Sequence, residues 1–316
     1  MPFSVLTDTS DNLPLKLIRQ HRIEIIPFVY RMDETDYVCT DIENFDGEDF
    51  YRKMKAGKVV TTTQIPPQQY ADFFEPYLRR GEDVIFVSMS SGISGSCHSA
   101  RIAADMLKED WPGRSVAVID TKGAALGEGL VALRAAELRD RGLSFPEAVE
   151  KLERLSRRMC NVFTVDDLLF LRRGGRLSNL AAIVGTVLNV KPLLKGDEEG
   201  RIVAFAKLRG RRKAIEALAE RYETLVREPG EQVVGIVHAD CGEDAEQLAA
   251  LLRRNKPPRE IVVVGYEPVT GCHVGPGALA LFFEGGDEVR TELNDIPNVL
   301  STVKTKLDGV RSALGG

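Results

Sequence analysis

Short apolar runs alternate with helical patterns through the first half of the chain, and this alternation restricts the possible fold more than any other feature. The apolar runs that we expect to be strands are residues 4–7, 23–29, 84–88 and 116–119. The helical patterns cover residues 14–20, 45–56, 67–79, 96–109, 126–141 and 145–158. This order favours an α/β fold with a mostly parallel sheet flanked by helices, because parallel strands need long crossover connections. Ligands of such sheets usually bind at loops after the carboxyl ends of the strands.

The second half of the chain has a less regular pattern, and we expect a domain boundary near residue 158. The prediction is an N-terminal α/β domain of residues 1–158 and a C-terminal α/β domain of residues 159–316. The expected C-terminal strands are residues 161–164, 191–195, 201–208, 233–237 and 261–265, and the expected helices are residues 165–172, 179–189, 211–227 and 243–254. The second and third of these strands flank a Gly-Asp-Glu-Glu-Gly turn, which predicts a hairpin. Apolar spacing over residues 296–314 predicts an amphipathic helix that packs on the body or on a partner.

Composition and charge narrow the class of protein. The net charge of −5 leaves no global basic field to attract nucleic acid or an anionic membrane. The five cysteines are scattered and form no Cys-x-x-Cys pair, which favours a reducing compartment and argues against disulfides or a zinc site. The N-terminus lacks the pattern of a signal peptide, and no apolar stretch approaches the ~20 residues of a membrane span. We therefore expect a cytoplasmic protein with no metal and no cofactor.

A Ser/Gly-rich loop, Met-Ser-Ser-Gly-Ile-Ser-Gly-Ser at residues 89–96, separates an apolar run from a helical pattern. Such a loop points N–H groups and hydroxyls at one place, and the helix that follows favours negative charge there. It contains no lysine and matches neither the P-loop nor Gly-x-Gly-x-x-Gly. Hydroxyls and amides alone suit an anion of single charge, such as a carboxylate. The alternative is a plain turn with Ser94 or Ser96 as the helix N-cap.

Two further segments carry polar groups beside turn signals. Thr61-Thr62-Thr63-Gln64 precedes two prolines, which favours extended backbone before a helix. It is either a polar loop or a hydroxyl cluster that faces the same ligand. His273 precedes a Gly-Pro-Gly turn, and its imidazole is either structural or a hydrogen-bond donor to a carboxylate.

Basic residues gather at residues 172–176 and 209–213, each just before a predicted helix. Cations at a helix start oppose the helix dipole by roughly 0.3–1 kcal/mol each, and such residues are usually solvated. The second group nonetheless makes a basic patch that could dock an acidic partner or an anionic group.

These segments, in this order, resemble the motifs of the DegV family of bacterial fatty-acid-binding proteins. The matching motifs are Leu-Thr-Asp-Thr-Ser-Asp-Asn-Leu-Pro (6–14), Thr-Thr-Gln-Ile-Pro-Pro (62–67), the Ser/Gly loop, Val-Ile-Asp-Thr-Lys (118–122), Leu-Arg-Arg-Gly-Gly-Arg-Leu-Ser (171–178), Asn-Val-Lys-Pro-Leu-Leu (189–194), Lys-Leu-Arg-Gly (207–210) and His-Val-Gly-Pro-Gly-Ala-Leu (273–279). Each motif is weak alone, but eight in order over residues 4–284 are jointly specific.

The resemblance implies a two-domain DegV-like α/β fold with its ligand between the domains. It implies a long-chain fatty acid as the ligand, presented to a separate fatty acid kinase that converts the carboxyl group to an acyl phosphate. By the resemblance, the carboxylate is held by Thr62, by a serine of the loop (Ser91 or Ser94) next to Gly95, and by His273.

The resemblance leaves some assignments open. Arg176 and Arg209 match arginines of family motifs and are assigned either to the head-group region or to the kinase contact. An apolar tunnel is required for the acyl chain, and parts of residues 102–107, 180–190 and 279–283 are its candidates.

The chain departs from the family motifs in two places that bear on the pocket. Ile65 stands where the family usually has proline, and Cys97-His98 replaces Tyr-Gln. The main alternative function is an acyl-transfer or hydrolytic enzyme in which Cys97, activated by the helix N-terminus, is the nucleophile and His98 or His273 is the base. A phosphoryl-transfer domain is a weaker alternative, because no P-loop is present.

Overall fold

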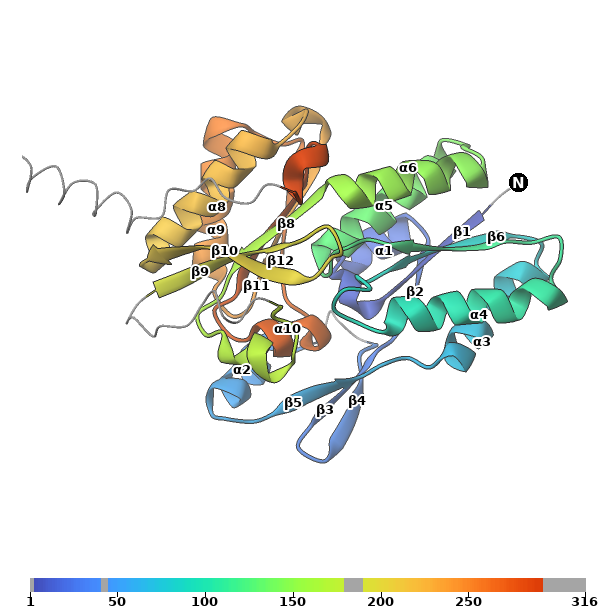
Figure 1. Cartoon of the computed structure of the whole chain (residues 1–316), viewed down its shortest axis with the longest axis horizontal. Helices are drawn as coiled ribbons and strands as arrows, with labels where there is room; N and C mark the ends of the chain where they lie inside the picture. Colours follow the sequence, from blue (N-terminus) through green and yellow to red (C-terminus); the bar gives the residue numbers. More distant parts are fainter. Residues whose placement is uncertain (1–2, 41–44, 179–189, 292–316) are drawn as a thin grey trace, which may run out of the picture.

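The computed structural model describes residues 3–40, 45–178 and 190–291 (Figure 1). Four parallel strands form the first sheet in the order β2-β1-β6-β7, which confirms the parallel sheet expected for the first half of the chain. They are β1 (Phe3–Asp8), β2 (Ile23–Ile26), β6 (Asp83–Ser88) and β7 (Val116–Asp120). The helices between and after them are α1 (Leu15–Gln20), α3 (Pro67–Arg79), α4 (Ser96–Asp110), α5 (Leu126–Asp140) and α6 (Phe145–Arg158).

Helices cover both faces of this sheet, as Figure 1 shows. Alternate residues of a strand point to opposite faces. Leu6 and Phe86 therefore pack with α3 and α4, whereas Val5 and Ile85 pack with α5 and α6. Because both faces are buried, the central strands appear in the sequence as continuous apolar runs.

A smaller antiparallel sheet projects from the first one and carries part of the site. Its order is β4-β3-β5, with β3 (Val29–Met32), β4 (Thr35–Val38) and β5 (Val60–Thr63); α2 (Gly47–Lys55) lies between β4 and β5 in the sequence. The single strand expected over residues 23–29 is wrong, because the chain leaves β2 at Pro27-Phe28 and enters the second sheet. The N–H of Phe28 donates to Thr9 Oγ1 at 3.0 Å and fixes this crossing.

The second large sheet is mixed and has the order β10-β9-β8-β13-β11-β12. Its strands are β8 (Met159–Thr164), β9 (Val190–Gly196), β10 (Ile202–Arg209), β11 (Val233–His238), β12 (Glu260–Gly265) and β13 (Leu279–Glu284). The predicted hairpin is present as the antiparallel pair β9–β10. Helices α8 (Arg211–Leu225) and α9 (Gly242–Asn255) pack on this sheet, and α7 (Leu169–Arg173) and α10 (Pro268–Val274) lie in its loops.

Helix α5 and the side chain of Arg290 are among the contacts that hold the large sheets together. Helix α5 packs on β1 and β6 of the first sheet and on β11 and β13 of the second. The buried guanidinium of Arg290 donates to backbone carbonyls of Thr121, Lys122, Ser156, Arg157 and Asp197, so one side chain ties the first sheet, α6 and the β9–β10 turn. All six strands of the second large sheet follow residue 158, while the division into two domains at that residue stays a prediction.

The helices expected at residues 179–189 and 296–314 lie outside the described residues. Among the described helices, none combines the length and the apolar character needed to span a membrane.

Candidate functional site

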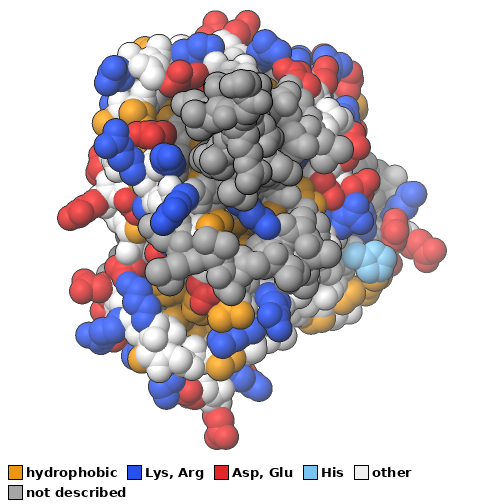
Figure 2. All heavy atoms as spheres, turned by 60° about the vertical axis from the view of Figure 1, so that its left-hand side comes forward, with side chains coloured by type: hydrophobic (Ala, Val, Ile, Leu, Met, Phe, Trp, Pro, Cys, Tyr) orange, Lys and Arg blue, Asp and Glu red, His pale blue; other side chains and the backbone are white. Residues whose placement is uncertain are grey.

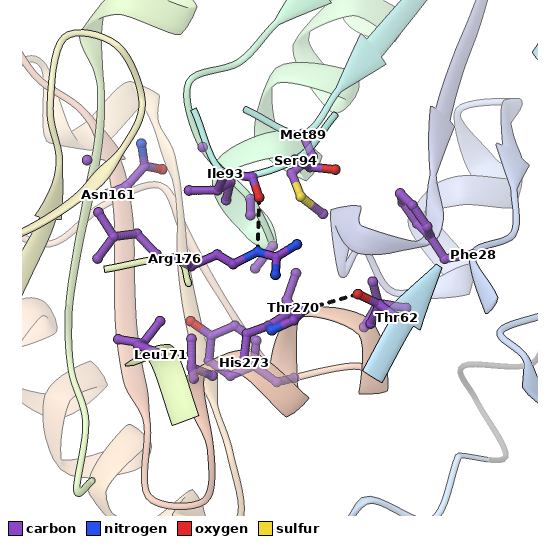
Figure 3. Close-up of a pocket in the computed structure, with 18 of the residues that line it drawn as sticks. Phe28, Thr62, Met89, Ile93, Ser94, Asn161, Leu171, Arg176, Thr270 and His273 are labelled. Carbon is purple, nitrogen blue, oxygen red and sulfur yellow. Dashed lines mark hydrogen bonds between the residues drawn. The ribbon is translucent and has the colours of Figure 1, made fainter. Parts of the chain in front are cut away.

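A cavity of about 200 Å³ lies where the loops after β5, β6 and β7 meet α10 and the second large sheet (Figure 3). Apolar side chains make up most of its wall. They are Phe28, Met89, Ile93, Phe163, Leu171, Ile202, Val269, Val274 and Phe282. Thr62, Ser94, Gly95, Arg176 and His273 also line it, so five of the residues predicted from sequence come together at one cavity.

Thr62 and His273 form a hydrogen-bonded pair in the cavity wall. Thr62 lies on β5, opposite Tyr30 of β3, and its Oγ1 is 3.1 Å from His273 Nε2 (Figure 3). A hydroxyl can accept from the imidazole and donate elsewhere at the same time. The pair can therefore present one O–H group to a ligand oxygen.

Helix α10 positions His273, and a buried carboxylate fixes the start of this helix. Glu267 is the N-cap, and its side chain accepts from the N–H groups of Val269 and Thr270. His273 lies in the last turn, which ends at Gly275. The φ of Gly275 is +78°, and a Cβ there would lie 2.2 Å from the Phe170 ring, so the turn requires glycine. The Gly-rich loop expected around His273 is therefore a short helix followed by a tight turn.

The imidazole of His273 is neutral near pH 7. Burial, together with the positive charge of Arg176, lowers its pKa from 6.5 to about 4. Arg176 lies between the loops of the two halves: its Nε donates to Ile93 O at 3.2 Å, and its Nη1 donates to Gly174 O. The guanidinium of Arg176, which acts on His273, is thus held by backbone carbonyls.

The Ser/Gly loop contributes one of its two candidate serines. Ser94 lines the cavity and donates to Ser96 Oγ at 3.0 Å. Ser91 is exposed and outside the cavity wall, because its hydroxyl and N–H both bond to the carboxylate of Asp120. The N-cap of α4 is Gly95 rather than Ser94 or Ser96. The N–H of Ser96, the first residue of α4, donates to Ser94 Oγ at 3.2 Å, so the Ser94 side chain lies at the start of the helix as well as in the cavity wall.

A second cavity, of about 320 Å³, adjoins the first at the Thr62–His273 pair. Thr62, Arg176 and His273 line both cavities, so the two meet at the predicted head-group residues. Lys58 and Arg173 also line the second cavity. The pair thus stands between a largely apolar space and one bordered by cations.

Some sequence predictions do not fall at the cavity. Arg209 is exposed at the end of β10 and lines neither cavity. Residues 102–107 of α4 are absent from the wall, and Ile102 and Met106 point to solvent. The tunnel wall expected there is wrong, because Ala103 and Leu107 pack in the core beside α3 and the rest of this stretch is outside the cavity wall. Of residues 279–283, which were also expected in the tunnel wall, Phe282 lines the cavity. Residues 180–189, the third expected part of that wall, are outside the described residues.

The activated cysteine proposed as an alternative is wrong on two counts. Cys97 is fully buried and is not in the cavity wall. Burial and the nearby Asp120 raise the pKa of its thiol to about 11, so the thiolate is scarce at neutral pH. The N-terminus of α4 does not offset the rise in the Cys97 pKa that burial causes.

The motif at residues 6–14 is buried in the fold rather than exposed in the cavity. Thr7 Oγ1 lies 3.0 Å from Val87 O and 3.1 Å from Glu128 Oε1. Thr7 and Ser10 both donate to the carboxyl group of Glu128, which is itself buried. Burial and the nearby Asp8 raise the pKa of Glu128.

Sequence comparison places these residues in a known family. The model described as "uncharacterised protein, DegV family" matches residues 2–285. The chain belongs to the DegV family. A DegV domain-containing protein of Clostridium perfringens is 35% identical over 287 residues, which cover 90% of this chain and 97% of the relative.

Solved DegV structures share the whole fold. DegV of Bacillus subtilis, described as a fatty acid binding protein, is 32% identical with a TM-score of 0.78, over 90% of this chain and 100% of that one. A DegV family protein of Thermus thermophilus, solved in a study of its fatty acid binding, is 29% identical with a TM-score of 0.82 over the same shares. A Ruminococcus gnavus family member with vaccenic acid is 22% identical, and its TM-score of 0.79 shows the common fold alone.

This DegV chain also lines its cavity with residues that sequence reasoning missed. Gln64 is one of them: its Nε2 donates to Ser99 Oγ at 2.6 Å, and Gly95 leaves room for its side chain. Asn161 lines the far side of the cavity from Thr62 (Figure 3). Nothing in the sequence distinguishes it from any other strand asparagine. Ile65, where the family usually has proline, packs in the core of α3 and α4.

Proposed function

We propose that this protein binds a long-chain fatty acid and presents its carboxylate to a separate fatty acid kinase, which forms the acyl phosphate. The observation that supports the proposal most directly is the Thr62–His273 pair, set between an apolar cavity and a cation-bordered one. The fatty-acid-binding DegV proteins of Bacillus subtilis and Thermus thermophilus support the same ligand class.

The carboxylate is assigned to the neutral donors around the pair. In this arrangement His273 Nε2–H donates to Thr62 Oγ1, and the Thr62 hydroxyl donates to a carboxylate oxygen. The Ser94 hydroxyl, which turns from Ser96 Oγ to the ligand, supplies a further donor. The positive charge of Arg176 offsets the negative charge of the carboxylate, so the Ser/Gly loop needs no lysine.

The acyl chain is assigned to the apolar part of the cavity. Transfer of each methylene from water contributes about 0.8 kcal/mol, so a chain of ~15 methylenes contributes roughly 12 kcal/mol before the costs of association and chain ordering. Hydrogen bonds to a charged group contribute only about 1.5–3 kcal/mol each. The chain therefore supplies most of the affinity, and the polar residues fix which end reaches the second cavity.

The surface near the site suits contact with another protein. Figure 2 shows one face of the molecule, on which Lys and Arg side chains are interspersed with Asp and Glu. Close to the pair, Lys58 and Arg173 line the second cavity. Val59 lines the second cavity and is 61% exposed. A kinase that docks here would bring its nucleotide to the carboxylate through the second cavity.

Lipid extraction and kinase reconstitution test the proposal. Protein purified from cells should release fatty acid on organic extraction and should exchange it for added labelled fatty acid. With a fatty acid kinase and ATP, it should support acyl phosphate formation, trapped with hydroxylamine as the hydroxamate. Thr62→Val should lose most of this product, while Ser91→Ala should retain it, because Ser91 lies outside the wall. Absence of extractable and exchangeable lipid would refute binding, and phosphate transfer by the chain without a kinase would refute the accessory role.

A further inference from the structure

A group of buried acidic side chains lies beside the start of α10, and we call it the acid cluster. Its members are all fully buried; they are Asp8 at the end of β1, Asp11 in a short 3-10 helix η1 (Thr9–Asp11), Glu128 on α5 and Glu267 at the start of α10. Ser10 Oγ lies 2.5 Å from Asp8 Oδ1 and 2.7 Å from Glu128 Oε2 and joins these two acids. Three members belong to the first half of the chain, whereas Glu267 caps the helix that carries His273.

No cation balances the acid cluster within residues 3–40, 45–178 and 190–291. None of its four side chains forms an ion pair there, and Asp11 Oδ2 has no hydrogen-bond partner. Helix α10 packs on η1, α2, α7, β3 and β5. The cations on these elements are exposed, and most of them pair with other carboxylates: Arg31 with Asp36, Arg52 and Lys53 with Asp49, and Lys55 with Asp240, while Arg172 and Arg173 are exposed on α7.

The other titratable groups around Glu267 do not supply a positive charge to it. They are the phenols of Tyr51 and Tyr266 and the thiols of Cys39 and Cys272. The Tyr51 hydroxyl donates to Tyr266 O at 2.9 Å and is thereby occupied. Lys16 and His238 line a separate cavity together with Glu267, and neither forms an ion pair with it.

Burial without a cation favours the neutral form of these acids. It raises the pKa of Glu267 from 4.5 to about 7, and the charge of Asp8 adds to the rise. Burial also raises the pKa of Asp8 from 3.8 to about 6, and it raises the pKa values of Asp11 and Glu128 well above their usual range. Above pH 6, therefore, Asp8 is ionised, and a second charge on Glu267 would face it in a buried site.

We propose that Glu267 is a positioning residue whose proton holds α10 against the rest of the acid cluster, so that fatty acid binding is linked to proton uptake. This inference rests on the proposed function. The Glu267 side chain caps α10 at the N–H groups of Val269 and Thr270, and the docked helix places His273 Nε2 3.1 Å from Thr62 Oγ1.

Loss of the proton from Glu267 weakens the docking of α10. The proton passes to solvent and leaves a carboxylate beside the ionised Asp8, and like charges repel strongly where water is excluded. This repulsion favours a state in which α10 moves away from η1 and His273 leaves Thr62. Val269, Thr270 and His273 of α10 line the first cavity, so the same movement removes one side of the ligand site.

The pH dependence of fatty acid affinity tests the inference. The probe is a saturated fatty acid kept below its micelle concentration, which is ionised from pH 6 to 8 because a free carboxyl group titrates near pH 4–5. A group that titrates near pH 7 when α10 is docked and near pH 4.5 when it is released changes the affinity by about tenfold over this range. The wild type should therefore bind about tenfold more weakly at pH 8 than at pH 6, with a profile that levels off above pH 7.

Two variants assign the pH dependence to Glu267. Glu267→Gln keeps an acceptor at the start of α10 but has no proton to lose, so its affinity should be equal at pH 6 and pH 8. Glu48→Gln is the matched control, because Glu48 is exposed and lines the same separate cavity as Glu267, and it should keep the tenfold change. A flat wild-type profile would overturn the inference, as would a Glu267→Gln variant with the wild-type profile.

Amide hydrogen exchange of the ligand-free wild type is a second test that needs neither a variant nor a lipid. After correction for the intrinsic exchange rate, the protection of residues 269–274 should fall about tenfold between pH 6 and pH 8 relative to that of α4. Protection of α10 that follows α4 at both pH values would overturn the inference. If no fatty acid binds at any pH, the proposed function fails separately, and the exchange of α10 still decides whether its docking is linked to a proton.

Discussion

Replacement of Thr62 by valine removes one hydroxyl from the head-group site and little else. Valine has nearly the shape of threonine and suits the strand position on β5. The variant breaks the 3.1 Å contact with His273 Nε2 and removes the donor that we assign to the carboxylate. The apolar wall of the cavity stays as it is, so the substitution separates the head-group contribution from that of the acyl chain.

The expected loss of ligand affinity in Thr62→Val follows from a comparison of the hydrogen bonds in the free and the ligand-bound protein. A hydrogen bond to a charged group contributes about 1.5–3 kcal/mol, and the orphaned His273 Nε2 costs the free and the bound protein alike, so it largely cancels. We expect Thr62→Val to weaken binding by about 2 kcal/mol, or roughly 30-fold in Kd. Each methylene should still contribute up to about 0.8 kcal/mol, because its contacts lie elsewhere in the cavity.

Displacement of a fluorescent fatty acid by saturated acids of increasing chain length measures both quantities. A plot of binding free energy against chain length should give parallel lines for wild type and Thr62→Val, offset by the head-group loss. Ser91→Ala should fall on the wild-type line, since the Ser91 hydroxyl bonds to Asp120 outside the wall. An offset of less than about threefold, or a change of slope, would show that the hydroxyl does not hold the carboxylate.

Two further predictions concern stability. Burial raises the pKa of Glu267 from 4.5 to about 7, so the folded state holds this proton more tightly than the unfolded state. The contribution of this proton to stability is fully present below pH 4.5 and is lost as the pH rises through 7. In denaturant titrations, the free energy of unfolding of the wild type, relative to Glu267→Gln, should therefore fall by about 2–3 kcal/mol between pH 5 and 8. A difference that stays constant with pH would contradict this prediction. Gly275 and Gly142 have φ values of +78° and +77°, but a Cβ meets Phe170 only at Gly275 and nothing within 4 Å at Gly142. Alanine at Gly142 should cost about 1 kcal/mol and alanine at Gly275 about 1–3 kcal/mol more, and equal losses would show that Phe170 moves aside freely.

The first sheet was predictable because its central strands are buried on both faces. Burial on two sides produces continuous apolar runs such as Val84–Val87, and helices between them leave a clear periodic pattern. The small sheet was not predictable in the same way. Its strands are short and partly exposed, and hydroxyls outnumber apolar groups in Val-Thr-Thr-Thr, so the sequence of β5 does not predict a strand. Only the pairing with β3 makes this segment a strand.

The residues of the site were predictable as a set but not as an arrangement. The family resemblance assigned Thr62, a serine of the loop (Ser91 or Ser94) and His273 to one ligand, and Thr62, Ser94 and His273 line one cavity. Which of Ser91 and Ser94 faces the cavity depends on Asp120, at the end of the neighbouring strand, because its carboxylate accepts hydrogen bonds from Ser91. Such a contact joins residues far apart in the sequence, and no local pattern encodes it.

A neutral histidine suits the proposed reaction better than a charged one. An imidazolium in contact with the carboxylate would form an ion pair and withdraw charge from the oxygen that must attack phosphorus. Burial and Arg176 instead lower the pKa of His273 to about 4, so the imidazole orients Thr62 by a hydrogen bond and leaves the carboxylate ionised and nucleophilic. The positive charge sits on Arg173 and Arg176, at the side where the phosphoryl group would arrive. The site thus separates orientation of the nucleophile from stabilisation of the added charge.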